Sequence, residues 1–133
     1  MSTLKVNTVQ HNTTGFNNVV QFQDGGGTEN GQLARAWVNF NGSGTVAIRA
    51  DFNVNSITEN AGNGDFTVNF DNAMSSANYC ITTAGGRGAP NTGGYAILAP
   101  DNADPTASNV RVRTTNFAGS LVDAPFICVS IFS

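Results

Sequence analysis

The chain has 133 residues, which is enough for one domain with its own hydrophobic core. Charged residues make up only 11% of the chain, against ~25% in a typical soluble domain, and the formal net charge is −3. The six basic residues are scattered and no apolar run of ~20 residues occurs, so neither a nucleic-acid-binding surface nor membrane insertion is expected.

Most of the polarity comes from uncharged residues. Asn occurs 18 times and Gly 15 times. Both residues favour turns, Gly because it has no Cβ and Asn because its side chain bonds to the local backbone. So many turn formers in a short chain predict many short strands.

The first 24 residues predict an extended N-terminal arm without a signal peptide. "TLKVNTVQ" (3–10) alternates imperfectly as a strand would, and "NVVQFQ" (18–23) gives a second short strand. The apolar residues of the arm are Leu4, Val6, Val9, Val19, Val20 and Phe22. The glycine-rich residues 25–33 predict a flexible linker, and the compact body is expected at 34–133.

The stretch "RAWVNFNGSGTVAIRADFNV" (35–54) predicts a β-hairpin. Its first half alternates, which places Ala36, Val38 and Phe40 on one face. "NGSG" (41–44) supplies the turn, after which alternation resumes. In the returning strand we expect Val46, Ile48 and Ala50 to share a face.

Short strands continue to the end of the chain. "DFTVNF" (65–70) alternates most cleanly, with Phe66, Val68 and Phe70 on its apolar face. The other strands are expected at 78–84, 95–100, 109–116 and 126–132. Nothing has helical spacing, so nine or ten short strands predict an all-β protein whose body is an antiparallel, jelly-roll-like β-sandwich.

The last predicted strand, "FICVSIF" (126–132), is apolar on both faces. Such a strand has to be covered on both sides, because an exposed apolar edge would aggregate. It can be a central strand of the body, or it can pack with one face against neighbouring subunits. The candidate subunit-interface residues are Phe126, Ile127, Val129, Ile131 and Phe132.

Residues able to perform catalysis are few. His11, the only histidine, lies in the arm, far in sequence from both cysteines, Cys80 and Cys128. Two cysteines and one histidine cannot form a four-ligand zinc site, and we expect both cysteines to be buried free thiols. The carboxylates considered for glycoside cleavage flank turns or face outward: Asp51, Glu59, Asp65 and Asp71.

No enzyme activity, cofactor or metal is therefore expected. "DNADP" (101–105) offers oxygen ligands of the kind calcium prefers, but it lacks EF-hand spacing and is interpreted as a turn.

The glycine-rich segment "GGRGAPNTGG" (85–94) is the candidate surface recognition loop. It lacks the Lys-Ser/Thr ending of a phosphate-binding loop, and no helix is expected after it. Binding residues favour loops on a rigid β scaffold, so Arg87, Asn91 and Tyr95 are the candidate recognition residues.

Two arginines lie on one face of the strand expected at 109–116. Arg111 and Arg113 alternate with Val110 and Val112, which indicates a polar outside and an apolar inside. An alternative is that both arginines cross a subunit boundary to meet carboxylates of another copy.

The stretch "ARAWVNFNGSGTVAIRADFNVNSITENAGNGDFTVNF", followed by "AMSSANYCI", resembles a module of bacteriophage fibre proteins found in phages of cyanobacteria and other marine bacteria. It covers about a third of the chain, and the opening "STLKVNTVQ" resembles the start of such fibres. The matching residues are Trp37, Asn39, Phe40, Gly42, Gly44, Phe52, Val54, Ile57, Gly64, Phe66, Val68, Phe70, Ala73, Met74, Asn78 and Tyr79. After Tyr79 the chain departs from the pattern.

The resemblance implies a virion structural protein, a homotrimer assembled in the host cytoplasm and carried on the phage particle. The apolar residues of the arm would anchor it to other virion proteins by strand or coil pairing. A short tail fibre or fibre knob fits the length of the chain, and so does a head fibre or capsid decoration protein. The tip loops of such proteins would contact the host surface, with a surface glycan as a candidate ligand.

A free carbohydrate-binding, lectin-like module is the competing hypothesis. Its binding site would lie in the loops at 85–94 and 101–108. The two hypotheses differ in oligomeric state, since a lectin module can act as a monomer whereas the fibre is expected to be a trimer.

Overall fold

The structure, a computed structural model, describes residues 20–24, 27–31, 33–60, 62–86, 95–98, 103–116 and 118–133. At 20–24, 27–31 and 95–98 the description covers the backbone only. In this part of the chain all the regular secondary structure is β-strand, and no helix there is long and apolar enough to cross a membrane. The chain divides into two compact units, Met1–Leu33 and Ala34–Ser133, described separately below.

In the first unit, β1 (Val20–Asp24) and β2 (Gly27–Gly31) form an antiparallel hairpin. The segment 25–33, predicted as a flexible glycine-rich linker, therefore contains the strand β2. Backbone hydrogen bonds can hold a polar, glycine-containing strand, and a pattern of apolar side chains does not reveal them. Of the predicted anchoring residues, Val20 and Phe22 belong to β1. Outside the described residues lie Leu4, Val6, Val9, Val19 and His11.

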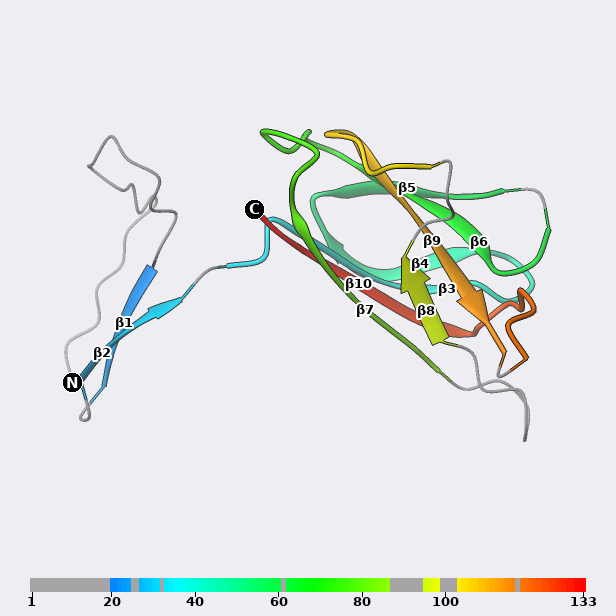
Figure 1. Cartoon of the computed structure of the whole chain (residues 1–133), viewed down its shortest axis with the longest axis horizontal. Coiled ribbons are helices and arrows are strands. Elements are labelled where there is room, and N and C mark those ends of the chain that lie inside the picture. The colour runs from blue at the N-terminus through cyan, green and yellow to red at the C-terminus, as the bar shows by residue number, and fades with distance from the viewer. Residues whose placement is uncertain are drawn as a thin grey trace. The chain divides into compact units, whose positions relative to one another are not determined.

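The second unit contains two four-stranded sheets in which all neighbouring strands are antiparallel. The first sheet has the order β4-β3-β10-β7 and the second has the order β5-β6-β9-β8 (Figure 1). The strands are β3 (Ala36–Asn41), β4 (Ala47–Phe52), β5 (Val54–Glu59), β6 (Asp65–Phe70), β7 (Cys80–Gly86), β8 (Tyr95–Leu98), β9 (Asn109–Thr115) and β10 (Phe126–Phe132). The predicted all-β fold with an antiparallel sandwich body is confirmed at this level.

The core lies between the inner faces of the two sheets. Phe40 of the first sheet meets Phe66 of the second edge to face, with ring centroids 5.4 Å apart. The buried apolar residues are Ala36, Val38, Phe40, Val54, Phe66, Val68, Phe70, Met74, Val110, Val112, Ala124, Ile127, Val129 and Ile131. Residues two apart on one strand recur in this set, as expected of strands with one face in a core.

The last strand, β10, is a central strand between β3 and β7. Ile127, Val129 and Ile131 are at most 1% exposed and pack in the core of their own chain. They are therefore not available to a neighbouring copy. Among the five predicted interface residues, only Phe126 and Phe132 alternate to the outward face of the sheet.

The chain crosses from the first sheet to the second through one residue, Asn53. Asn53 has a φ of 56°, in the left-handed region that Asn tolerates better than most residues. Its side-chain oxygen accepts the Asn72 backbone N–H at 2.7 Å, and its amide donates to the Arg35 carbonyl at 3.1 Å. The sequence predicted one returning strand through 54, but β4 ends at Phe52 because the backbone turns at Asn53.

A bulge changes the faces of β4. The register between β3 and β4 shifts at Asn39/Phe40, so Phe40 pairs with Ile48 and Asn39 pairs with Ala50. Phe40 points into the core and Asn39 points outward, which places Ile48 and Ala50 on opposite faces. The expectation that both share a face is wrong, because an inserted residue reverses strand alternation.

Tyr79 gives a first testable prediction. Its hydroxyl lies 2.9 Å from the Thr106 carbonyl and 3.0 Å from the Asn109 carbonyl, and its ring packs edge to face on Phe70. We expect Tyr79→Phe to lower the free energy of unfolding by about 1 kcal/mol in urea titrations at pH 7, because two backbone carbonyls lose their shared donor.

Burial also raises the pKa of Tyr79 to about 12 from 10.0. Because the folded-state pKa is the higher one, the neutral phenol contributes stability below pH 10 that is lost as the pH rises toward 12. The difference in ultraviolet titration between the wild type and Tyr79→Phe isolates this group. A midpoint near 10 would contradict the prediction.

Candidate functional site

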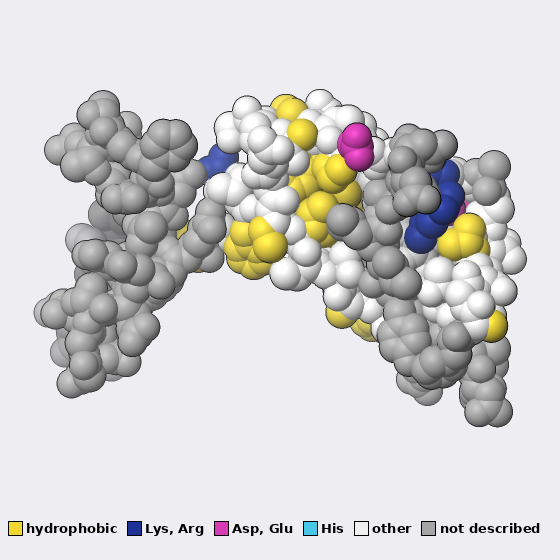
Figure 2. Space-filling view, in the orientation of Figure 1, with side chains coloured by type: hydrophobic (Ala, Val, Ile, Leu, Met, Phe, Trp, Pro, Cys, Tyr) yellow, Lys and Arg dark blue, Asp and Glu magenta, His cyan; other side chains and the backbone are white. Residues whose placement is uncertain are grey.

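The outer face of the first sheet carries almost no charge. Its outward positions on β3, β10 and β7 follow from alternation with the buried residues and from the register. We define the uncharged face by these residues and by the outward part of β4: Trp37, Asn39, Asn41, Ala47, Ala50, Phe52, Cys80, Thr82, Ala84, Phe126, Cys128, Ser130 and Phe132. Figure 2 shows hydrophobic side chains at several points on the surface of the second unit.

Three large aromatic residues of this face are exposed to solvent. Trp37 is 40% exposed, Phe52 is 55% exposed and Phe126 is 46% exposed. Trp37 and Phe52 are partners in the register of β3 and β4, so they stand side by side. Exposed aromatic groups that gather on one sheet face are typical of surfaces that bind another protein.

A charged side chain beside this face is that of Arg49. Its guanidinium lies 4.3 Å from the centre of the Phe126 ring and donates to the Pro125 carbonyl at 2.6 Å and to Asn39 Oδ1 at 3.3 Å. The charge is thereby held against an aromatic ring and neutral acceptors. The aliphatic part of the Arg49 side chain therefore adds to the apolar contact area of the uncharged face, and its charged end does not interrupt that area.

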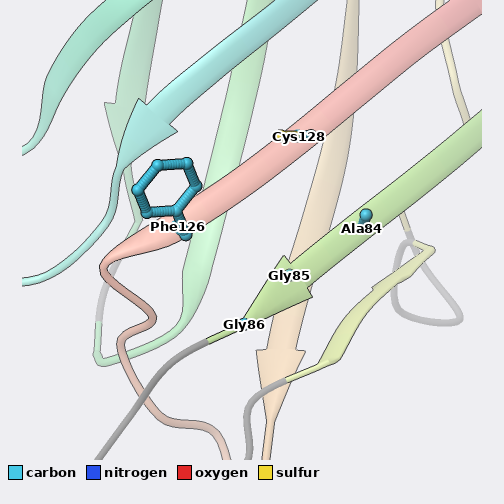
Figure 3. Close-up of a pocket in the computed structure, with 5 residues that line it drawn as sticks. All are labelled: Ala84, Gly85, Gly86, Phe126 and Cys128. Atoms are coloured by element: carbon cyan, nitrogen blue, oxygen red, sulfur yellow. The ribbon is translucent and has the colours of Figure 1, made fainter.

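A shallow hollow of about 320 Å³ opens on the uncharged face between β10 and β7. It is lined by Ala84, Gly85, Gly86, Phe126 and Cys128, and the Phe126 ring stands beside it (Figure 3). Apart from one thiol, these lining residues are apolar or glycine, so the hollow can accept an apolar side chain from another molecule.

Both cysteines are free and both lie on the outward side of the first sheet. Cys80 is exposed and Cys128 is half-buried. Cys80 pairs in register with Phe132, and Cys128 pairs with Ala84, so the two thiols are separated along the strands. The prediction of free thiols is confirmed. Their predicted burial is wrong, because β10 and its neighbour have apolar residues on both faces and the pattern does not say which face is inner.

The outer face of the second sheet is polar and contains a buried carboxylate. Asp65 is 1% exposed and accepts from Arg111 Nε at 2.6 Å, from Arg111 Nη2 at 2.7 Å and from Arg113 Nε at 2.8 Å. Asn60 donates a fourth hydrogen bond at 2.9 Å. Hydrogen bonds from Arg111, opposed by burial and aided by Arg113 and Asn60, lower the pKa of Asp65 to about 2.

Neutral hydrogen-bonding side chains surround this cluster. Asn69 donates to Thr58 Oγ1 at 3.0 Å and to Ser56 Oγ at 3.2 Å, while Asn60 bonds to Thr67. We define the polar face by the following residues: Ser56, Thr58, Asn60, Asp65, Thr67, Asn69, Arg111 and Arg113. Figure 2 shows arginine side chains at the surface where β9 and β6 lie.

Both arginines meet a carboxylate of their own chain, Asp65, as the simpler of the two hypotheses allows. The alternative contact with carboxylates of another copy stays a prediction. Asp65 and Arg111 are 46 residues apart in sequence, and strand pairing alone brings them together. The sequence feature that could have indicated this pairing is the opposite charge of Asp65 and the two arginines, which stand at outward positions of two cleanly alternating strands.

The other predicted site residues are distributed as follows. Arg87 and Asn91 of the candidate recognition loop lie outside the described residues, and Tyr95 begins β8, where it pairs in register with Thr115. The remaining carboxylates considered for catalysis are exposed: Asp51, Glu59 and Asp71. Within the described ranges, no three metal-ligating side chains form a cluster.

No protein-family model, curated protein or solved structure matches this chain. The likeness of residues 34–81 to phage fibre modules therefore stays a prediction. The candidate functional surfaces are therefore the two outer sheet faces, of which one is uncharged and the other contains paired arginines.

Proposed function

We propose that the chain is a structural subunit of a phage virion, a short tail fibre or fibre knob that forms a homotrimer through the uncharged face. The body would be a jelly-roll-like sandwich, the N-terminal arm would anchor it to other virion proteins, and the protein would not act as an enzyme. A head fibre or capsid decoration protein would use the same surface.

The observation that carries this proposal is the exposure of Trp37, Phe52 and Phe126 on a face whose defining residues are all uncharged. An apolar sheet face open to water favours association. We take further copies of the chain as its occupants, because uncharged faces packed around a three-fold axis meet without like-charge repulsion. A different partner would more often be selected through complementary charges.

The uncharged face alone is smaller than a standard interface. Four strands spaced ~4.8 Å apart, with six or seven residues of ~3.3 Å each, span roughly 20 by 20 Å. A standard interface buries ~800 Å² per partner, so in the proposed trimer each copy would bury further surface beside the uncharged face. The hollow beside Phe126 is a place where a side chain of the neighbour would insert.

Oligomeric state tests the proposal directly. We expect the full chain to sediment as a trimer at micromolar concentration and Trp37→Glu to sediment as a monomer, because the new carboxylate would be buried without a partner. Trp37 is 40% exposed, so the variant should still fold, which circular dichroism checks.

The matched control is Asn55→Glu, which adds the same charge at an exposed position of β5 in the second sheet. It should leave the trimer intact. Thiol labelling adds a second readout, since Cys128 lines the hollow and should react slowly in the assembled wild type and in Asn55→Glu, but quickly in the Trp37→Glu monomer. A wild-type monomer with a freely reactive Cys128 would overturn the proposal.

A further inference from the structure

Two guanidinium groups share a single carboxylate on the polar face. Arg111 and Arg113 lie two residues apart on β9 and both bond to Asp65. Two positive charges and one negative charge leave the cluster with one unneutralised positive charge. Among the described residues no second carboxylate pairs with either arginine, whose side chains are 30% and 33% exposed.

The buried carboxylate fixes both arginines in place. All the hydrogen bonds to Asp65 come from this cluster, and the Asp65 side chain is 2% exposed. Arg111 donates two N–H groups to Asp65 and Arg113 donates one. Most N–H groups of the two guanidinium groups therefore have no acceptor in the described part of the chain. Side chains held in this way lose little conformational entropy when a ligand binds.

We propose that Arg111 and Arg113 bind the carboxylate or sulfate groups of an acidic polysaccharide. Guanidinium forks match planar and tetrahedral oxyanions through paired hydrogen bonds. The neighbouring groups are hydroxyls and amides, with Thr67 opposite Arg111 in register and Asn60 bonded to both Thr67 and Asp65. Such neutral groups suit the hydroxyls of a sugar chain.

The charge distribution argues against a general affinity for polyanions. The whole chain has a net charge of −3, so a polyanion would be repelled except where local positive charge is concentrated. A nucleic acid would need a row of basic residues to follow its phosphates, and this site has two. The site lies on the sheet opposite the uncharged face, so it does not depend on the proposed trimer or on a virion role.

Binding of the full chain to immobilised polymers tests the proposal. The probes are polygalacturonate for carboxylate, dextran sulfate for sulfate, uncharged dextran, and single-stranded polydeoxyadenylate. We expect binding at low ionic strength to at least one acidic polysaccharide, weakening as salt screens the charges, and none to dextran. The stronger of the two acidic probes identifies the oxyanion.

Arg113→Gln should reduce the apparent affinity at least about tenfold, because it removes the excess charge while Arg111 keeps its two bonds to Asp65. Arg113→Lys should recover only part of the affinity, since lysine cannot form the fork. The matched control, Arg35→Gln, removes an exposed charge before β3 and should leave the affinity unchanged. Thermal unfolding and sedimentation of each variant separate lost binding from lost fold or assembly.

Three results would overturn the proposal. They are no binding to either acidic polysaccharide, an equal loss in Arg113→Gln and Arg35→Gln, or equally strong binding to the polynucleotide. Each is independent of oligomeric state, so glycan binding can fail while the chain still forms a trimer.

Discussion

Gly64→Ala is expected to destabilise the chain by about 3 kcal/mol or more, enough to unfold a domain of ordinary stability in part of the population. A Cβ at this position would lie 2.5 Å from the Thr114 carbonyl oxygen, 2.6 Å from the Val122 oxygen and 2.7 Å from the Val122 nitrogen. All three are backbone atoms, so no side chain can rotate away to relieve the contact.

The position of Gly64 explains why the backbone cannot move aside. Its carbonyl accepts the Thr114 N–H at 2.8 Å, and its N–H donates to Asp123 Oδ1 at 2.7 Å. It therefore joins the start of β6 to the end of β9 and to the segment before β10. Displacing it would break contacts in each of these places.

Gly44 provides a matched control for Gly64→Ala. Both glycines have a φ of 68°, but nothing lies within 4 Å of a Cβ at Gly44. Gly44→Ala should therefore cost only the conformational strain, about 1 kcal/mol. Denaturant midpoints of the two variants, with soluble yield as a second measure, give the comparison. Equal losses would mean that backbone strain alone, and not the close contact, makes Gly64 necessary.

Asp65→Asn is expected to lower the free energy of unfolding by about 2 kcal/mol at pH 7. The carboxylate is buried and bonded to two arginines, so a neutral amide would leave both cations without a counter-charge. The arginines are about a third exposed, and water therefore compensates part of this loss. Asp71→Asn, which changes an exposed carboxylate just after β6, should change stability by less than about 0.5 kcal/mol.

The same pair predicts how stability depends on pH. The pKa of Asp65 is lowered from 3.8 to about 2, so its contribution is present above pH 3.8 and is lost as the pH falls through 2. Urea unfolding at a series of pH values should show wild-type stability falling between pH 4 and 2. The fall should be smaller in Asp65→Asn, and parallel curves for the two proteins would contradict the assignment.

Alternation alone located much of the body. The cleanest strand, 65–70, corresponds to β6, and its predicted apolar face of Phe66, Val68 and Phe70 is buried. The same holds for Ala36, Val38 and Phe40 in β3. Period-two patterns work here because each of these strands has one face in the core and one face toward solvent.

Alternation did not give the correct side-chain faces or strand ends where a bulge, a turn or the pairing of strands determines them. The bulge opposite Phe40 and the turn at Asn53 break the period in β4, and neither leaves a distinctive residue pattern. In β10 both faces are apolar, so the pattern could not say that Ile127 points inward and Cys128 points outward. Only the pairing of β10 between β3 and β7 decides this.

The two candidate surfaces were predictable to different degrees. The outward direction of Arg111 and Arg113 followed from their spacing, but their shared partner Asp65 did not, because it requires the β6–β9 register. The uncharged face was anticipated only through Phe126 and Phe132. Trp37 and Phe52 were missed as a pair because they become neighbours through the register of β3 and β4.

The passage of the chain through Asn53 constrains how this domain could change in length. One residue separates Phe52 in the first sheet from Val54 in the second, and Val54 is 7% exposed. An insertion or deletion of one residue here would turn β5 over, exposing its apolar side to water and directing its hydroxyls toward the interior. The turn where β4 meets β5 is thus a poor place for single-residue changes of length in evolution or protein engineering.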